Sequence, residues 1–249
     1  MLAGVGVTWY TWLEQGRDIR PSAGALSAIA DALRLDPTER RHLHTLNDRP
    51  EPEPSSHGTE RVEAPLLRML ASLTSQPAYV LGRRWDILAW NNAATAVFGD
   101  YARLAGDERN IMYLVFVDQA HRRLLADWDS IARIVLAMFR ADSARYLGHP
   151  DFERLIATLR SASTEFAQWW LAQDVKLPLA GDKWIHHPSA GRMGFEYTML
   201  QVTGQPDVKF VVYTPLESDR STAKLQALLR DLPEQTAGSS IPASRPQIV

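Results

Sequence analysis

The sequence predicts an α+β protein in which a small all-helical N-terminal domain precedes a larger domain built on an antiparallel sheet. A proline-rich, polar stretch from Asn47 to Glu60 separates two segments that each carry their own apolar periodicity. In the second segment, two strand-like runs come early and three come late, with several helical patterns between them. Strands at both ends of a helical segment favour one five-stranded antiparallel sheet with the helices on one of its faces.

The composition is that of a folded protein and excludes several kinds of site. Hydrophobic residues make up 45% of the 249 residues, which is enough for a packed core. The sequence has no cysteine, which excludes disulfides, thiol catalysis and cysteine-ligated zinc. No apolar run approaches the length of about 18 residues that crosses a bilayer. We therefore expect a cytoplasmic protein that does not enter membranes.

The stretch from Gly4 to Gly16 has the pattern of a helix-turn-helix. Gly4 and Gly6 allow a tight turn between two helices, and Gly16 ends the second of them. Helical periodicity places Tyr10 and Leu13 inward and another set of residues outward, where the major groove of DNA would lie. That outward set, with two arginines that suit phosphate oxygens, makes up the predicted DNA-binding residues: Val7, Thr8, Thr11, Trp12, Arg17 and Arg20.

Two more helices complete this N-terminal domain, which we assign to residues 1–47. Ser22 is a good N-cap for the first, and Asp36 with Glu39 can form a capping box for the second. Residues 1–46 contain five arginines and five acidic residues, a balance of zero, so charge alone does not predict DNA binding. A plain helical bundle is the alternative interpretation of this segment.

The second domain is assigned to residues 63–232, after a linker at 48–62 and before a tail at 233–249 that we expect to be disordered. Asn91 is the expected cap of a helix after the first hairpin, and the apolar run from Phe210 to Tyr213 is typical of a central strand. Asp118 is the expected start of one long helical stretch. The predicted elements are helices at 64–73, 93–98, 118 onward, 152–159, 164–173 and 221–229, and strands at 77–81, 86–90, 182–187, 192–202 and 209–214.

With these motifs in hand, the chain resembles the MmyB-like regulators of the xenobiotic-response-element class. The N-terminal match is the run Leu2-Ala3-Gly4-Val5-Gly6-Val7-Thr8-Trp9-Tyr10-Thr11-Trp12-Leu13-Glu14-Gln15-Gly16-Arg17. The second domain matches at Trp85-Asp86-Ile87-Leu88-Ala89-Trp90-Asn91, Asp127-Trp128, Gly181-Asp182-Lys183-Trp184-Ile185-His186-His187-Pro188 and Val212-Tyr213-Thr214-Pro215. The resemblance implies a PAS-like sensor, a five-stranded sheet cupped by helices, that binds a long-chain fatty acid or a similar apolar effector. It also implies a dimeric DNA-binding part, and, since the family carries further helices before the position of Met1, a truncated N-terminal domain.

A cup between sheet and helices predicts a ligand pocket lined by aromatic and aliphatic side chains. The alternative is that these residues are ordinary core. Arg133 and Arg140 are not expected to anchor a ligand carboxylate, because helical periodicity places both opposite the apolar face, and Asp129 precedes Arg133 by four residues. The carboxylate could then simply reach solvent at the pocket mouth. The candidate pocket residues are Phe98, Phe116, Trp128, Val135, Phe139, Phe166, Trp170, Phe195, Tyr197 and Met199.

The sequence does not favour an enzyme or a metal site. His186 and His187 are adjacent on a predicted strand and point to opposite faces, so they cannot share one metal. We therefore predict a ligand-responsive transcriptional regulator without catalytic residues, metal or cofactor other than its effector. Its predicted partners are double-stranded DNA, a small apolar ligand such as a fatty acid, and a second copy of itself. The alternative function is a stand-alone lipid-binding protein whose helix-turn-helix is a non-functional remnant.

Overall fold

A computed structural model describes residues 11, 13–15, 21–46, 60–146, 148–172 and 182–232. The chain divides into two compact units, Met1–Thr59 and Glu60–Val249. The division falls within the predicted linker. The predicted tail at 233–249 lies outside the described residues.

The described part of the N-terminal unit contains helices α2 (Ala23–Ala32) and α3 (Pro37–Leu46). Ser22 Oγ accepts a hydrogen bond from the backbone N–H of Ala25 at 3.2 Å, which confirms the predicted cap of α2. Asp36 and Glu39 bond to each other's backbone N–H groups, each at 2.9 Å, which is the predicted capping box of α3. Leu26 and Ile29 are buried, so α2 packs through the apolar face that its sequence predicts.

The second unit is built on a five-stranded antiparallel sheet, as the sequence predicts. The strands lie in the order β2-β1-β5-β4-β3, so the first hairpin pairs with the last strand of the chain. Side chains alternate across this sheet, and each face has its own hydrophobic cluster. The strands are β1 (Ala78–Leu81), β2 (Ile87–Trp90), β3 (Asp182–His187), β4 (Gly191–Val202) and β5 (Gln205–Pro215).

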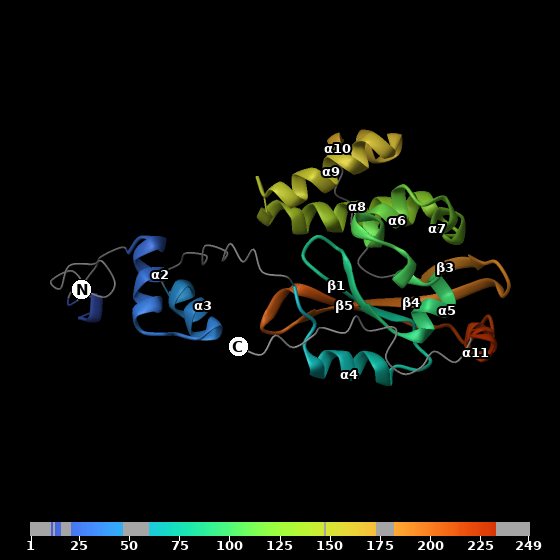
Figure 1. Cartoon of the computed structure of the whole chain (residues 1–249), viewed down its shortest axis with the longest axis horizontal. Helices are drawn as coiled ribbons and strands as arrows, with labels where there is room; N and C mark the ends of the chain where they lie inside the picture. The colour runs from blue at the N-terminus through green and yellow to red at the C-terminus, as the bar shows by residue number, and fades with distance from the viewer. Residues whose placement is uncertain are drawn as a thin grey trace. The chain divides into compact units, whose positions relative to one another are not determined.

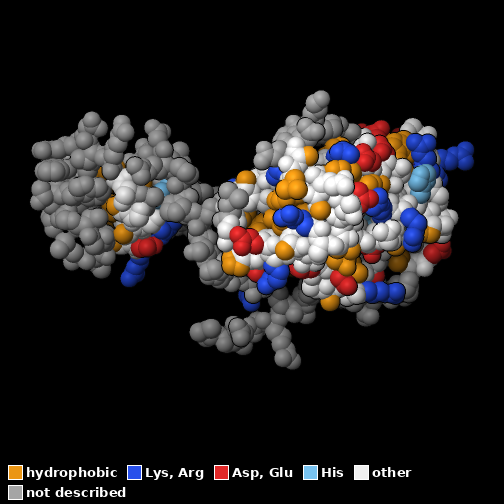
Figure 2. All heavy atoms as spheres, turned by 90° about the horizontal axis from the view of Figure 1, so that it is seen from above, with side chains coloured by type: hydrophobic (Ala, Val, Ile, Leu, Met, Phe, Trp, Pro, Cys, Tyr) orange, Lys and Arg blue, Asp and Glu red, His pale blue; other side chains and the backbone are white. Residues whose placement is uncertain are grey.

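The larger core lies between one face of the sheet and a group of helices, and Figure 1 shows α9 and α10 on the outer side of α6 and α8. One helix departs from the expected layout, because α4 packs on the opposite face, where Leu70 meets Val80 and Phe210. The helices of this unit are α4 (Ala64–Ser72), α5 (Asn92–Phe98), α6 (Ile111–Phe116), α7 (Gln119–Leu124), α8 (Trp128–Ser143), α9 (Pro150–Ala162), α10 (Thr164–Leu171) and α11 (Ser221–Asp231). From the helical side, apolar side chains are interspersed with basic and acidic ones (Figure 2).

The prediction of one long helix from Asp118 is wrong, because the helix breaks between α7 and α8. Leu125 adopts an extended conformation and forms a β-bridge with Ile185 of β3, and the N–H of Ala126 donates to the carbonyl of Trp184 at 3.0 Å. Asp127 then caps α8 through its side chain. Pairing with the edge strand therefore overrides the local helical pattern. The sequence also did not predict α6, which begins where the Asn110 side chain caps the N–H of Met112 at 2.8 Å.

The turn between β1 and β2 ties the sheet to α8. Trp85 is buried in this turn with a left-handed φ of 67°, and its Nε1–H donates to the carboxylate of Asp142 at 2.8 Å. Asp142 also forms an ion pair with Lys209 of β5 at 3.0 Å, and Lys209 is only 7% exposed. The indole of Trp85 packs edge-on against Phe139, with ring centroids 5.8 Å apart. The C-terminal half of α8 is thus held to the sheet by both charge and packing.

We expect Asp142→Ala to lower the free energy of unfolding by roughly 3 kcal/mol, because it leaves the Lys209 ammonium buried without its counter-charge. Asp129→Ala on the same helix is the matched control. The Asp129–Arg133 ion pair, at 2.8 Å, is more than half exposed, and its loss should cost below about 1 kcal/mol. Urea unfolding of the two variants measures the difference, and equal losses would show that the Asp142–Lys209 pair is not a stabilising clamp.

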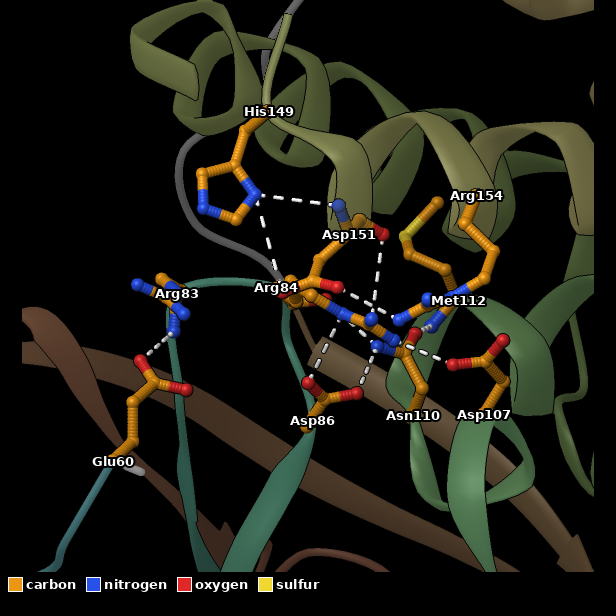
Figure 3. A network of polar contacts seen from close by, with 10 residues as sticks. All are labelled: Glu60, Arg83, Arg84, Asp86, Asp107, Asn110, Met112, His149, Asp151 and Arg154. Carbon is orange, nitrogen blue, oxygen red and sulfur yellow. Dashed lines mark hydrogen bonds and ion pairs between the residues drawn. The ribbon is translucent and has the colours of Figure 1, made fainter. Parts of the chain in front are cut away.

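The same turn contacts Glu60, the first residue of the second unit. The Glu60 carboxylate accepts the backbone N–H of Arg83 at 2.7 Å (Figure 3), and burial raises its pKa. A Cβ at Gly82 would lie 2.3 Å from a Glu60 oxygen, so only glycine leaves room for this carboxylate. Arg84, next in the turn, forms ion pairs with Asp86 and Asp107. The start of the second unit is therefore fastened to the β1–β2 turn.

Gly82→Ala should displace the Glu60 carboxylate and cost about 1 kcal/mol of stability, the usual net value of one lost hydrogen bond. Glu60→Ala should cost a similar amount for the same reason. Because both changes remove one interaction, the double variant should be no less stable than either single variant, which urea unfolding of the four proteins tests. Additive losses would mean that Gly82 and Glu60 do not act together.

Candidate functional site

A cavity lies between the larger core face of the sheet and helices α6, α7 and α8. Its volume is about 30 Å³, so a ligand larger than a few atoms enters only if side chains or helices move. The lining comes from strands β1, β3 and β5, from helices α5 to α8 and from the segments between those helices. The lining residues are Tyr79, Phe98, Tyr101, Ile111, Val115, His121, Leu125, Ile131, Val135, Lys183, Ile185 and Tyr213.

The strands place polar groups on the floor of this cavity by simple alternation. Lys183 and Ile185 are two residues apart on β3 and so face the same side, while Trp184 between them faces the other. Tyr79 on β1 and Tyr213 on β5 face the cavity from the middle of the sheet. The floor therefore combines one ammonium group with phenol groups that the sequence spacing does not bring together.

These polar groups form a connected cluster. The hydroxyl oxygens of Tyr79 and Tyr213 lie 3.0 Å apart, and Lys183 Nζ donates to the Tyr213 hydroxyl at 3.4 Å. Lys183 Nζ also lies 4.0 Å from the ring centroid of Tyr197, a cation–π distance. Burial raises the pKa of Tyr79 and of Tyr101 well above the usual value of a phenol, so both stay neutral hydrogen-bonding groups at pH 7.

His121 adds a neutral imidazole to the wall. Burial lowers its pKa to about 4; Asp118 acts in the opposite direction, and the nearby charge of Lys183 lowers the pKa further. The His121 side chain is partly buried and lines the cavity. At pH 7, Lys183 is thus the only cationic side chain among the described residues that line the cavity.

The rest of the lining is apolar. Ile111 and Val115 come from α6, and Ile131 and Val135 come from the N-terminal half of α8. Leu125 contributes from the break between α7 and α8. The cavity is therefore amphipathic, with its polar groups on the sheet and α7 and an aliphatic wall on α6 and α8. Such a site suits a small molecule with one polar end.

Two of the ten candidate pocket residues, Phe98 and Val135, line this cavity. Phe116 and Phe166 contact each other in the core with ring centroids 5.2 Å apart, and Phe166 stacks on Trp170. The other candidates also lie in or against the larger core, away from the cavity lining, although Tyr197 contacts Lys183. Those candidates are Trp128, Phe139, Phe195, Tyr197 and Met199.

The structure confirms the interpretation of the two arginines. Arg133 forms the predicted surface pair with Asp129. Arg140 donates to the backbone carbonyls of Trp169 and Trp170 at 2.7 and 3.0 Å, where α10 ends. Neither lines the cavity. The cation that does so, Lys183, went unnoticed in the sequence, although its alternation with Ile185 on a predicted strand was a usable signal.

The predicted DNA-binding residues are hardly covered by the structure. Val7, Thr8, Trp12, Arg17 and Arg20 lie outside the described residues. Thr11 lies in a short helical segment, where its carbonyl accepts the N–H of Gln15 at 3.0 Å. Their roles at DNA stay predictions.

The described part of the chain lacks two other features. It holds no group of three or more histidine or acidic side chains placed to bind a metal ion. It also holds no helix that is both long and apolar enough to span a membrane.

The buried His121 predicts a loss of stability in acid. The unfolded chain takes up a proton near pH 6.5, whereas the folded protein resists it until about pH 4, so stability falls as the pH drops between these values. We expect the stability difference between the wild type and His121→Gln to shrink by about 2 kcal/mol between pH 7.5 and pH 4.5. Urea unfolding at both pH values measures this, and a constant difference would contradict a buried neutral imidazole.

Comparisons with known proteins agree with this architecture. Residues 62–229 match the family model described as MmyB-like transcription regulator ligand binding domain, which covers the sheet and all the helices around the cavity. Residues 1–43 match a model described as helix-turn-helix domain. No curated protein matches the sequence. Since the first match spans more than half of the chain, this protein belongs to the MmyB-like family of helix-turn-helix transcription regulators.

Proposed function

We propose that this protein is a DNA-binding transcriptional regulator controlled by a fatty acid or similar small apolar effector, which binds in the cavity between the sheet and helices α6–α8. The observation that carries the proposal is the amphipathic lining of that cavity. An aliphatic wall from Ile111, Val115, Ile131 and Val135 suits a hydrocarbon chain. The helix-turn-helix match at residues 1–43 supports the DNA-binding half.

The small cavity volume gives the effector a way to act. A hydrocarbon chain needs more space than about 30 Å³, so a bound effector favours a conformation in which the helices lie farther from the sheet. A ligand shifts an equilibrium only by its differential affinity for two states, and this change of volume supplies such a difference. The unit then works as a PAS-like sensor whose state depends on its occupancy.

The proposed regulator acts as a homodimer without a cofactor. A single helix-turn-helix reads one half-site, and helix-turn-helix proteins commonly bind two half-sites as dimers. In such a dimer, a conformational change of the sensor alters the distance or orientation between the two DNA-binding units. The dimer then matches the spacing of the two half-sites better or worse. The rival function is lipid binding alone, with an inactive helix-turn-helix.

A mobility-shift titration with the DNA upstream of the coding sequence separates the two functions. The regulator should bind a specific site, and the logarithm of its affinity should fall linearly with the logarithm of salt concentration. Arg17→Ala should reduce that slope by about one, because it removes a phosphate contact. Arg133→Ala in the sensor is the control and should leave the slope unchanged.

Two further results would contradict or refine the proposed regulator function. If neither this chain nor one extended upstream of Met1 binds the DNA specifically, the regulator function is wrong. Mass spectrometry of the denatured protein tests for an enzyme, since a chemically altered ligand would show turnover. An unmodified apolar acid would support binding.

A further inference from the structure

Lys183 occupies an unusual position for a lysine. It lies on β3 with its side chain half-buried, facing the cavity floor between the rings of Tyr197 and Tyr213. Its ammonium group lies 3.4 Å from the Tyr213 hydroxyl. A lysine in a strand more often extends to solvent, because removing its charge from water is costly.

No carboxylate balances this charge. Within the described residues, Lys183 has no acidic side chain within 4.0 Å, and its polar contacts are one hydroxyl and two aromatic rings. Lys209, the buried lysine of β5, is by contrast paired with Asp142 at 3.0 Å. Asp118, the acidic residue beside His121, already accepts the backbone N–H of His121 as the cap of α7. The cavity thus holds a cation that lacks its partner.

The hydroxyl pair beside Lys183 leaves one O–H donor unused. Tyr79 and Tyr213 carry two O–H groups, and the contact between them uses one, whichever of the two donates. The ammonium group likewise has three N–H donors and uses one on Tyr213. The floor therefore offers at least two unused N–H groups and one O–H group within one cluster. Surplus donors around a positive charge match an oxyanion.

We propose that Lys183, with the Tyr79–Tyr213 hydroxyl pair, binds the carboxylate of the effector on the sheet side of the cavity. This inference rests on the proposed effector site and narrows its ligand to amphipathic monoanions. The hydrocarbon chain then runs along the aliphatic wall of α6 and α8. From the sequence, the effector carboxylate was expected to reach solvent at the mouth of the pocket. In the proposed site it instead lies inside the cavity, against β1, β3 and β5.

The test compares two probes that differ only in the head group, octanoate and octan-1-ol, by calorimetric titration of the full chain at pH 7.5. The wild type should bind octanoate at least tenfold more tightly than octan-1-ol, because charge-assisted hydrogen bonds are about twice as strong as neutral ones. Lys183→Met should reduce this ratio to about one while changing the affinity for octan-1-ol by less than about threefold, since the aliphatic wall is intact.

Two further variants keep the test independent of folding defects. Lys183→Arg retains the charge and should retain a preference for octanoate, and Tyr213→Phe should lower octanoate affinity several-fold with little effect on octan-1-ol. Lys224→Met is the matched control, because Lys224 on α11 donates to the carbonyl of Arg192 at an exposed position. It should leave both affinities unchanged.

The outcomes separate this inference from the proposed function. A wild type that binds both probes equally, or a Lys183→Met variant that keeps the octanoate preference, overturns the carboxylate site alone. A wild type that binds neither probe overturns the pocket and, with it, the proposed effector. If octanoate binds through Lys183 but does not change DNA affinity, the carboxylate site stands and the regulatory function is wrong.

Discussion

The ion pair between Asp142 and Lys209 is the interaction on which the rest of the second unit depends. Asp142 ends α8, and its carboxylate joins Lys209 of β5 to the indole N–H of Trp85 in the β1–β2 turn. A buried charge without a counter-charge is costly, so this pair favours one position of α8 above the sheet. The cavity lies about two to three turns earlier on the same helix, where Ile131 and Val135 line it.

The other end of α8 is fixed in a different way. The break at Leu125–Asp127 is bonded to the edge strand β3 through the backbone of Ala126, and Leu125 itself lines the cavity. Trp128, the first residue of α8, adds a second connection, because its Nε1–H donates to the carbonyl of Val115 on α6 at 2.7 Å and its ring packs against Phe116. The two ends of α8 are therefore held by different interactions, an ion pair to the central strand β5 at one end and backbone and indole hydrogen bonds at the other.

The sequence predicted the sheet well and the cavity floor poorly, for one physical reason. Strand alternation and caps such as Asn91 are local patterns, and local patterns specify which face a side chain takes. They do not specify which residues are neighbours across the sheet. The sequence therefore did not predict the cluster of Lys183, Tyr213 and Tyr79, in which Tyr213 lies 30 residues from Lys183 and 134 residues from Tyr79. The helix break at Leu125 and the left-handed Trp85 likewise arise from tertiary contacts that override local preference.

The β1–β2 turn connects the start of the second unit to α8. Glu60, the first residue of that unit, accepts the N–H of Arg83, and two residues after Arg83 the indole N–H of Trp85 donates to Asp142. One short turn therefore contacts both Glu60 and the helix that forms a wall of the cavity. The turn is held in one conformation, because Trp85 is buried and the Gly82 N–H donates to the carbonyl of Asp86 across the turn. A movement of α8 that displaces Trp85 therefore also displaces the Arg83 N–H that binds Glu60. The attachment depends on Gly82 in particular, since a side chain there would occupy the place of the Glu60 carboxylate.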